Sequence, residues 1–156
     1  DDVFEAWLDR TSPGSPWFGV PKAIVNPPKV DGLFYSMYQL EGREISHYGR
    51  FITLEKPRKI QHTWVSEATR GLESVVTLSF EPVEGKTRVH VNHSNIPDDE
   101  EGRRHEHAWG YVLGAMRSRF GKMNRKEHQE PQKKQVAAER RMKQRQLSKN
   151  LFFKER

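Results

Sequence analysis

The chain has 156 residues, which is enough for one domain and a tail but short for two ordinary domains. It contains no cysteine, so disulfides, thiolate nucleophiles and Cys-ligated metals are excluded, and a reducing, cytoplasmic location is expected. Its net charge of +6 is uneven: residues 1–116 hold 13 Lys and Arg against 17 Asp and Glu, whereas residues 117–156 hold 14 against 4. The basic character therefore belongs to the tail and does not mark the whole chain as nucleic-acid-binding. No apolar run approaches the roughly 20 residues that span a bilayer.

A short amphipathic helix is expected over residues 3–8. Its apolar residues have the spacing of one buried stripe: Val3, Phe4, Trp7 and Leu8. The Pro and Gly residues of segment 11–16 end the helix with turn chemistry. Trp17 and Phe18 follow as large apolar residues in a loop-like stretch, and we expect both to fill the core.

Short strands separated by turn residues are predicted for the middle of the chain. The candidate strands are 22–25, 33–40, 44–55, 59–65, 73–81 and 87–94. The connections have the length of hairpin loops, which predicts an antiparallel meander.

Alternation of apolar and polar residues predicts the buried face of this meander. In the last three strands the inward positions are Ile60, His62, Trp64, Val76, Leu78, Phe80, Val89, Val91 and His93. The strand segment 47–53 does not alternate cleanly, so its inward face is not assigned.

A long closing helix is predicted to begin within residues 97–101, where acidic side chains suit the helix N-terminus. Its apolar stripe consists of His105, Trp109, Val112, Leu113, Met116 and Phe120. Beyond residue 122 the apolar period fades, and a basic tail, helical or disordered, is expected.

Several short sequence motifs occur in the order typical of one family. They are segments 3–7, 16–18, 32–37, 47–51, 57–64, 87–89, 93–94 and 108–113, together with Gly42. From Val3 to about Arg117 the chain resembles the homologues of the heat-shock protein 90 ATPase activator, a family of the START-like (SRPBCC) superfamily.

This resemblance implies an α+β helix-grip fold, in which a curved antiparallel sheet wraps around a long C-terminal helix and a cavity lies between them. It implies a domain over residues 1–121, and the charge pattern adds a basic tail over residues 122–156. The family normally has a strand before the first helix, whereas only two residues precede that helix here, so upstream residues are expected to be missing. The basic tail is foreign to the family pattern.

The apolar inward face is the best candidate for a ligand site, given the cavity that the resemblance implies. The predicted lining residues are Trp17, Ile60, His62, Trp64, Val76, Leu78, Phe80, Val89, Val91, His93, Trp109, Val112, Leu113 and Met116. The alternative is that these side chains simply fill the core at ordinary packing density.

His62 and His93 are the polar groups of interest on this face. Either could orient a carbonyl or hydroxyl of a ligand, or act as an acid or base near neutral pH. The alternative is a structural histidine bonded to its surroundings, which is what the resemblance implies for His93. No metal or other cofactor is expected, because His105 and His107 project about 200° apart on a helix. No catalytic set is recognisable either, since the chain has no serine elbow and no phosphate-binding glycine loop.

The most consistent interpretation is a non-catalytic domain that binds a small apolar ligand. Two alternatives stay open: a co-chaperone domain that stimulates a chaperone ATPase, and a cyclase- or hydrolase-like enzyme that uses His62. The expected partners are a small apolar ligand or a chaperone, with nucleic acid bound only non-specifically by the tail. The chain is expected to be a monomer or a homodimer.

Overall fold

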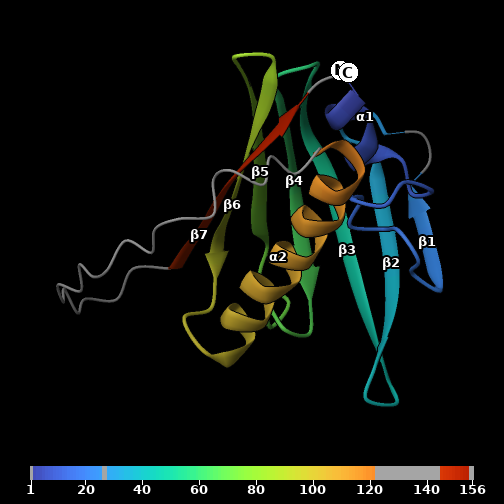
Figure 1. Ribbon diagram of the computed structural model, residues 1–156. Helices are drawn as coiled ribbons and strands as arrows, with labels where there is room; N and C mark the ends of the chain where they lie inside the picture. Colours follow the sequence, from blue (N-terminus) through green and yellow to red (C-terminus); the bar gives the residue numbers. More distant parts are fainter. Residues whose placement is uncertain (1, 26–27, 122–144, 155–156) are drawn as a thin grey trace, which may run out of the picture.

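The computed structural model describes residues 2–25, 28–121 and 145–154 (Figure 1). Its elements in chain order are α1 (Asp2–Leu8), β1 (Lys22–Val25), β2 (Leu33–Leu40), β3 (Arg43–Glu55), β4 (Lys59–Ser66), β5 (Ser74–Val83), β6 (Lys86–Ile96), α2 (Glu100–Phe120) and β7 (Arg145–Lys154). Both predicted helices and all six predicted strands are present, with ends that differ from the predicted ones by three residues at most. The predicted α+β class is confirmed.

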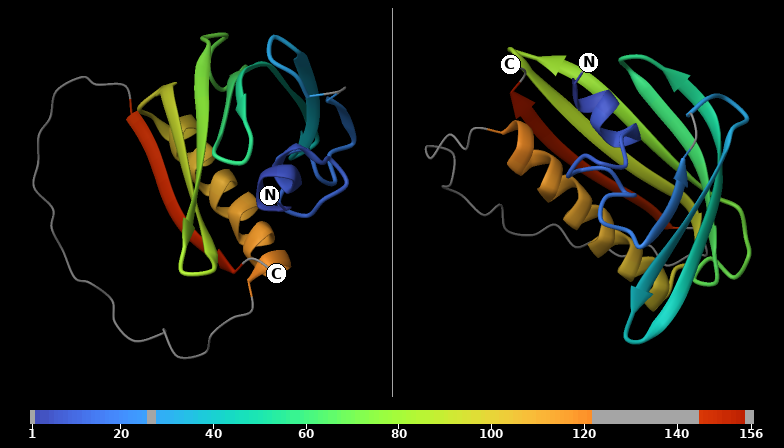
Figure 2. Two further views of the ribbon diagram at one scale, coloured as in Figure 1. Left: turned by 90° about the horizontal axis from the view of Figure 1, so that it is seen from above. Right: turned by 90° about the vertical axis from the view of Figure 1, so that its right-hand side faces the viewer.

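The strands form one antiparallel sheet in chain order, from β1 to β7. The sheet is strongly curved, and α2 lies along its concave side (Figure 2). Helix α1 packs beside the C-terminal part of α2 on the same side, so the two helices cover the concave face together. This arrangement is the helix-grip fold that the family resemblance implies.

The predicted inward face is confirmed for β4, β5 and β6, where every assigned inward residue is buried. Thr63 is also buried although it lies on the opposite face of β4. Its hydroxyl accepts the backbone N–H of Arg50 at 2.9 Å, which explains how a polar side chain is accommodated there.

Strand β3 contains a β-bulge, which is why its sequence does not alternate. Phe51 pairs with His62, but Thr53 pairs with Gln61, so Ile52 is an extra residue on β3. The inward phase therefore shifts by one residue along the strand: His47, Gly49 and Phe51 are buried before the bulge, and Leu54 packs against the core after it.

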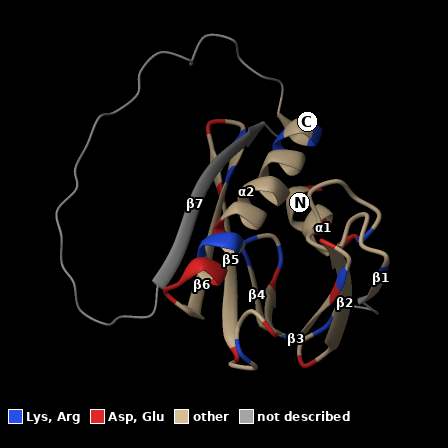
Figure 3. Ribbon diagram, turned by 90° about the horizontal axis from the view of Figure 1, so that it is seen from below, with Lys and Arg blue, Asp and Glu red and all other residues tan. Residues whose placement is uncertain are grey.

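Helix α2 is fixed at its N-terminus by Asp99, whose side chain accepts the backbone N–H groups of Glu101 and Gly102. The predicted stripe faces the sheet: His105, Trp109, Leu113 and Met116 are buried, and Val112 and Phe120 are partly buried. Acidic residues open the helix and basic residues follow, as Figure 3 shows. Neither helix in the described residues is long and apolar enough to cross a membrane.

The two aromatic residues of the segment between α1 and β1, both predicted to fill the core, differ in their exposure. Trp17 is buried, with 1% of its surface exposed, but Phe18 is 48% exposed, so the prediction for Phe18 is wrong. The two residues lie in a turn, in which the backbone N–H of Phe18 donates to the carbonyl of Ser15 at 3.2 Å, and only one of the two side chains is directed into the core. Gly14 brings this segment against α2: a Cβ there would lie 2.7 Å from Cβ of Met116.

The C-terminal part of the chain differs from the expected helical or disordered tail at residues 145–154, which form β7. Strand β7 pairs with β6 from Lys86↔Lys154 to Ile96↔Arg145. Without it, the backbone of β6 would present unpaired N–H and C=O groups along one edge, and a strand that pairs with them removes that cost. Composition alone does not reveal such an edge. The rest of the predicted tail lies outside the described residues.

Candidate functional site

Aromatic rings from five parts of the fold surround one histidine at the centre of the core. His62, on β4, is fully buried, and five ring centroids lie within 6.3 Å of its own. We call this group the His62 cluster: His62 with Trp7 of α1, Trp17 of the α1–β1 segment, Phe34 of β2, Phe51 of β3 and Trp64 of β4. The ring of Phe34 stands at 90° to that of His62, an edge-to-face arrangement.

The tautomer of His62 follows from its one hydrogen bond. Its Nδ1 lies 2.9 Å from the carbonyl oxygen of Thr63, which can only accept, so Nδ1 carries a proton. Burial lowers the pKa of His62 to about 4, so the ring is neutral at physiological pH. Nε2 is therefore a lone-pair acceptor, and it has no hydrogen-bond partner.

The same cluster also contains unpaired donors. The indole Nε1–H groups of Trp7, Trp17 and Trp64 are all buried and have no hydrogen-bond partner. Buried polar groups are normally satisfied, and each one left unpaired costs about 1–3 kcal/mol. Four such atoms in one cluster mark this part of the core as the place where a polar partner would be stabilised.

A second histidine, His93 of β6, is fully hydrogen-bonded. Trp109 of α2 donates its Nε1–H to Nδ1 of His93 at 3.0 Å, and Nε2 of His93 lies 2.8 Å from Oγ of Ser74 on β5. Ser74 in turn donates to the backbone carbonyl of Trp64 on β4. This chain, the His93 relay, connects α2 to three strands, and it matches the structural role considered for His93 from the sequence.

Two more histidines lie toward the N-terminal end of α2. His47 of β3 and His105 of α2 have ring centroids 6.5 Å apart, and His105 is 5.3 Å from His93. Burial and the neighbouring His105 lower the pKa of His47 to about 4. Burial lowers the pKa of His105 as well, and His93 is held well below its usual pKa, first by burial and then by the nearby histidines.

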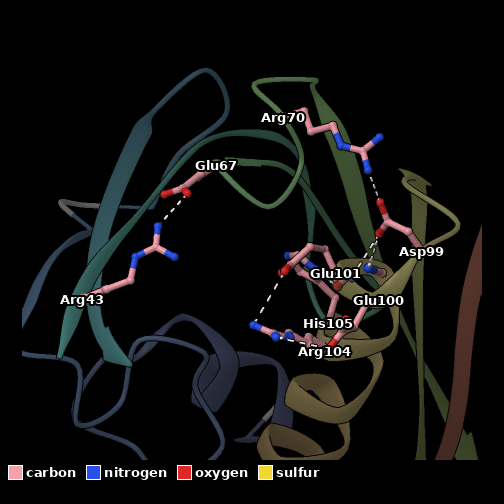
Figure 4. Close-up of polar contacts among 9 residues, drawn as sticks. Arg43, Glu67, Arg70, Asp99, Glu100, Glu101, Arg104 and His105 are labelled. Atoms are coloured by element: carbon pink, nitrogen blue, oxygen red, sulfur yellow. Dashed lines mark hydrogen bonds and ion pairs between the residues drawn. The ribbon is translucent and has the colours of Figure 1, made fainter. Parts of the chain in front are cut away.

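Ion pairs lie around the same end of the sheet, as Figure 4 shows. Arg70 pairs with Asp99, the residue that caps α2, and Arg43 pairs with Glu67 at 2.7 Å across two hairpin ends. Arg104 pairs with Glu100 at 3.2 Å within α2. These side chains are largely exposed, so each pair adds little stability.

A surface hollow lies elsewhere, between α1 and the C-terminal end of α2. Its volume is about 550 Å³, and it is lined by Asp2, Glu5, Ala6, Leu8, Asp9, Pro28, Arg119 and Phe120. None of the predicted cavity-lining residues borders it. Among the described residues, no group of three or more His, Asp or Glu side chains could hold a metal ion.

The structure brings the predicted lining residues into one buried core but gives them different surroundings. Trp17, His62 and Trp64 belong to the His62 cluster, and Val76 pairs with His62 across the β4–β5 ladder. His93 and Trp109 belong to the relay. The remaining predicted residues pack in the same apolar core, Val112 only in part: Ile60, Leu78, Phe80, Val89, Val91, Val112, Leu113 and Met116.

Sequence reasoning missed four members of the His62 cluster and the His93 relay, which are Trp7, Phe34, Phe51 and Ser74, and it also missed the nearby His47. The spacing of segment 3–8 predicts Trp7 only as part of a buried helix stripe, and the bulge in β3 conceals the inward phase of Phe51 and His47. Phe34 shares the inward face of β2 with Ser36, and a buried serine two residues away hides that face from a pattern of apolar alternation.

The His93 relay gives a prediction about stability. We expect Trp109→Phe to lower the free energy of unfolding by about 2 kcal/mol more than Trp7→Phe does. Both changes remove a buried indole, but only the first breaks a hydrogen bond and leaves Nδ1 of His93 unpaired. Urea unfolding of the two variants measures the difference, and equal losses would show that the relay does not stabilise the fold.

Comparison with known proteins agrees with the fold. Protein CV1439 from Chromobacterium violaceum has a similar structure, with a TM-score of 0.63 at 17% sequence identity, over 74% of this chain and 85% of that one. A protein from Rhodobacter sphaeroides gives a TM-score of 0.50 at 22% identity, over 74% of this chain and 80% of that one. At these identities the likeness concerns the fold alone.

No curated protein matches the sequence significantly. The profile of the family described as "Activator of Hsp90 ATPase homolog 1-like protein" matches residues 1–121. This part of the chain holds α1, β1 to β6 and α2, and it includes the His62 cluster and the His93 relay. The chain therefore belongs to the Activator of Hsp90 ATPase homolog 1-like family.

Proposed function

We propose that this domain binds a small, mainly apolar molecule at the His62 cluster, without catalysing a reaction. One observation carries the proposal: three indole N–H groups and one imidazole nitrogen are buried together without hydrogen-bond partners. A core that served stability alone would gain from phenylalanine at these positions, because phenylalanine brings no unpaired polar atom. A ligand that supplies the missing partners would recover the lost free energy.

The walls of the cluster suit an apolar ligand. Apart from the four polar atoms, the surfaces around His62 are aromatic rings, and the residue opposite His62 on β5 is Val76. Small-molecule sites commonly combine such apolar walls with a few polar groups that orient the ligand. No Lys, Arg, Asp or Glu belongs to the cluster, which favours an uncharged molecule.

Trp17 is the ring that a ligand can displace most readily. It is the one member of the cluster that lies outside any helix or strand. The neighbouring backbone is held by local turn hydrogen bonds and by side-chain contacts rather than by a sheet ladder: Tyr38 donates to the carbonyl of Pro16, and Arg119 donates to Ser12. Movement of this segment would open space beside Phe34 and Phe51, whose ring centroids lie 5.0 and 6.0 Å from that of Trp17.

The lowered pKa of His62 bears on the enzyme alternative. A ring that is neutral at physiological pH has no proton on Nε2 to give, so it does not act as a general acid there. The co-chaperone alternative and the cytoplasmic location stay predictions from the sequence.

Native mass spectrometry of the purified protein tests the proposal. We expect a bound small molecule on the wild type, and a loss of at least about tenfold in its occupancy in Val76→Phe, which adds a ring beside His62. Val75→Phe is the matched control, because Val75 is the adjacent residue of β5 on the opposite face of the sheet and only half-buried. Its occupancy should equal that of the wild type.

Two results would contradict the proposal. One is a wild-type protein that neither carries a molecule nor binds an added apolar probe such as naphthalene saturably. The other is equal loss of binding in Val75→Phe and Val76→Phe, which would place the site away from His62. Circular dichroism of each variant checks that the fold is retained.

A further inference from the structure

We propose that the ligand of the His62 cluster is an uncharged, ring-containing alcohol or phenol whose hydroxyl donates to Nε2 of His62 and accepts from an indole N–H group. This inference rests on the proposed function and adds the chemical class of the ligand. It follows from which atoms of the cluster lack partners and from the hydrogen-bonding role that each of them has.

The backbone carbonyl of Thr63 determines which nitrogen of His62 is the hydrogen-bond acceptor. Because the carbonyl of Thr63 accepts from Nδ1 of His62, Nε2 carries the lone pair and needs a donor. A ketone, an ether or a carboxylate only accepts, so none of them can satisfy this atom. The partner of Nε2 must therefore carry an O–H or N–H group.

The donors of the cluster impose the opposite requirement. Trp7, Trp17 and Trp64 each present an unpaired Nε1–H, and an indole nitrogen can only donate. Trp109 provides the contrast within the same core, since its Nε1–H is already accepted by His93. A hydroxyl group donates and accepts through one oxygen atom, so one such group can serve both kinds of atom in the cluster.

The charge and shape of the surroundings narrow the class further. A charged ligand would lie among aromatic rings with no opposite charge in the cluster, which is costly. The rings pack edge-to-face, with Trp17 at 64° to Phe34 and 69° to Phe51. This arrangement accepts another flat ring in place of Trp17, so a ring-containing alcohol or phenol fits better than a long aliphatic chain.

A matched pair of probes tests the inference: 2-naphthol and naphthalene, which differ by one hydroxyl. We expect the wild type to bind 2-naphthol about tenfold more tightly, as one well-placed hydrogen bond allows. In His62→Leu the preference should fall to about one while naphthalene still binds. His90→Leu, on the outer face of β6, is the control and should keep the wild-type preference. Isothermal titration calorimetry measures all three proteins.

A second measurement uses the wild type alone, so it does not depend on how a variant folds. In ¹⁵N NMR spectra, the Nε2 resonance of His62 should move on addition of 2-naphthol and much less on addition of naphthalene. If both probes bind equally tightly, the hydroxyl assignment is wrong and the proposed function stands. If neither binds, the proposed function itself fails. If His62→Leu keeps the preference for 2-naphthol, His62 is not the acceptor.

Discussion

Acidification from pH 6.5 to pH 4 should unfold this domain. Burial lowers the pKa of His47 and His62 to about 4, and it lowers the pKa of His93 and His105 as well. In the unfolded chain these histidines titrate near 6.5. Between those values the unfolded state binds more protons than the folded state, so the free energy of unfolding falls as the pH falls.

The size of this effect decides the outcome. Each proton that only the unfolded state binds contributes a slope of about 1.4 kcal/mol per pH unit, so His47 and His62 together give roughly 2–3 kcal/mol per pH unit near pH 5. The lowered pKa values of His93 and His105 add to this slope in the same direction. A domain of this size is commonly stable by only about 5–15 kcal/mol. We therefore expect the stability contributed by these four groups to be complete above pH 6.5 and largely lost by pH 4.

Urea unfolding at a series of pH values measures this slope. His62→Gln should reduce it by about 1 kcal/mol per pH unit, because it removes an imidazole that is protonated near pH 5 in the unfolded state and neutral in the folded one. His107→Gln, at an exposed position of α2, is the control and should leave the slope unchanged. A stability that is constant between pH 7 and pH 5 would show that the histidines are protonated in the folded domain without cost.

Gly49→Ala should be among the most destabilising single substitutions in the sheet. A Cβ at Gly49 would lie 2.1 Å from Cζ of Phe34 and 2.4 Å from the backbone oxygen of Thr63. The ring of Phe34 is itself fixed within the His62 cluster, and the carbonyl of Thr63 belongs to β4, so neither can move away freely. We expect a loss of about 3 kcal/mol in the free energy of unfolding.

Gly114→Ala is the matched control for this substitution. Gly114 lies in the middle of α2, and a Cβ there would meet nothing within 4 Å. Alanine has the higher helix propensity, so this variant should be more stable than the wild type by up to about 1 kcal/mol. Thermal unfolding of both variants checks the opposite signs, and a neutral Gly49→Ala would mean that β3 and β4 can separate at this point.

The sheet could be predicted from the sequence because its signals are local. Hairpin-length connections and strict alternation define β4, β5 and β6 without reference to distant residues, and their inward faces are confirmed. The bulge at Ile52 could not be predicted in the same way. An extra residue on one strand is visible only in its pairing with the next, as the change of register between Phe51 and Thr53 shows.

The candidate site was predictable only in part. His62 and Trp64 follow from alternation within one strand, whereas Trp7 and Phe34 join them through the packing of α1 and β2. The pairing of the indole N–H groups was not predictable at all: Trp109 finds an acceptor in His93 and Trp7 does not, although both lie on apolar helix stripes. Whether an indole N–H group finds an acceptor depends on how closely its helix approaches a strand, to within a few ångströms, and a sequence pattern does not contain that distance.

The position of β7 also bears on the order in which the sheet forms. Neighbouring strands from β1 to β6 are joined by short connections, whereas the ladder between β6 and β7 closes a loop that contains all of α2. The entropy lost on closing a loop grows with its length, so of the six strand ladders this one has the largest entropic cost of formation. The six-stranded meander and α2 can therefore assemble first, and β7 joins an edge that is already formed.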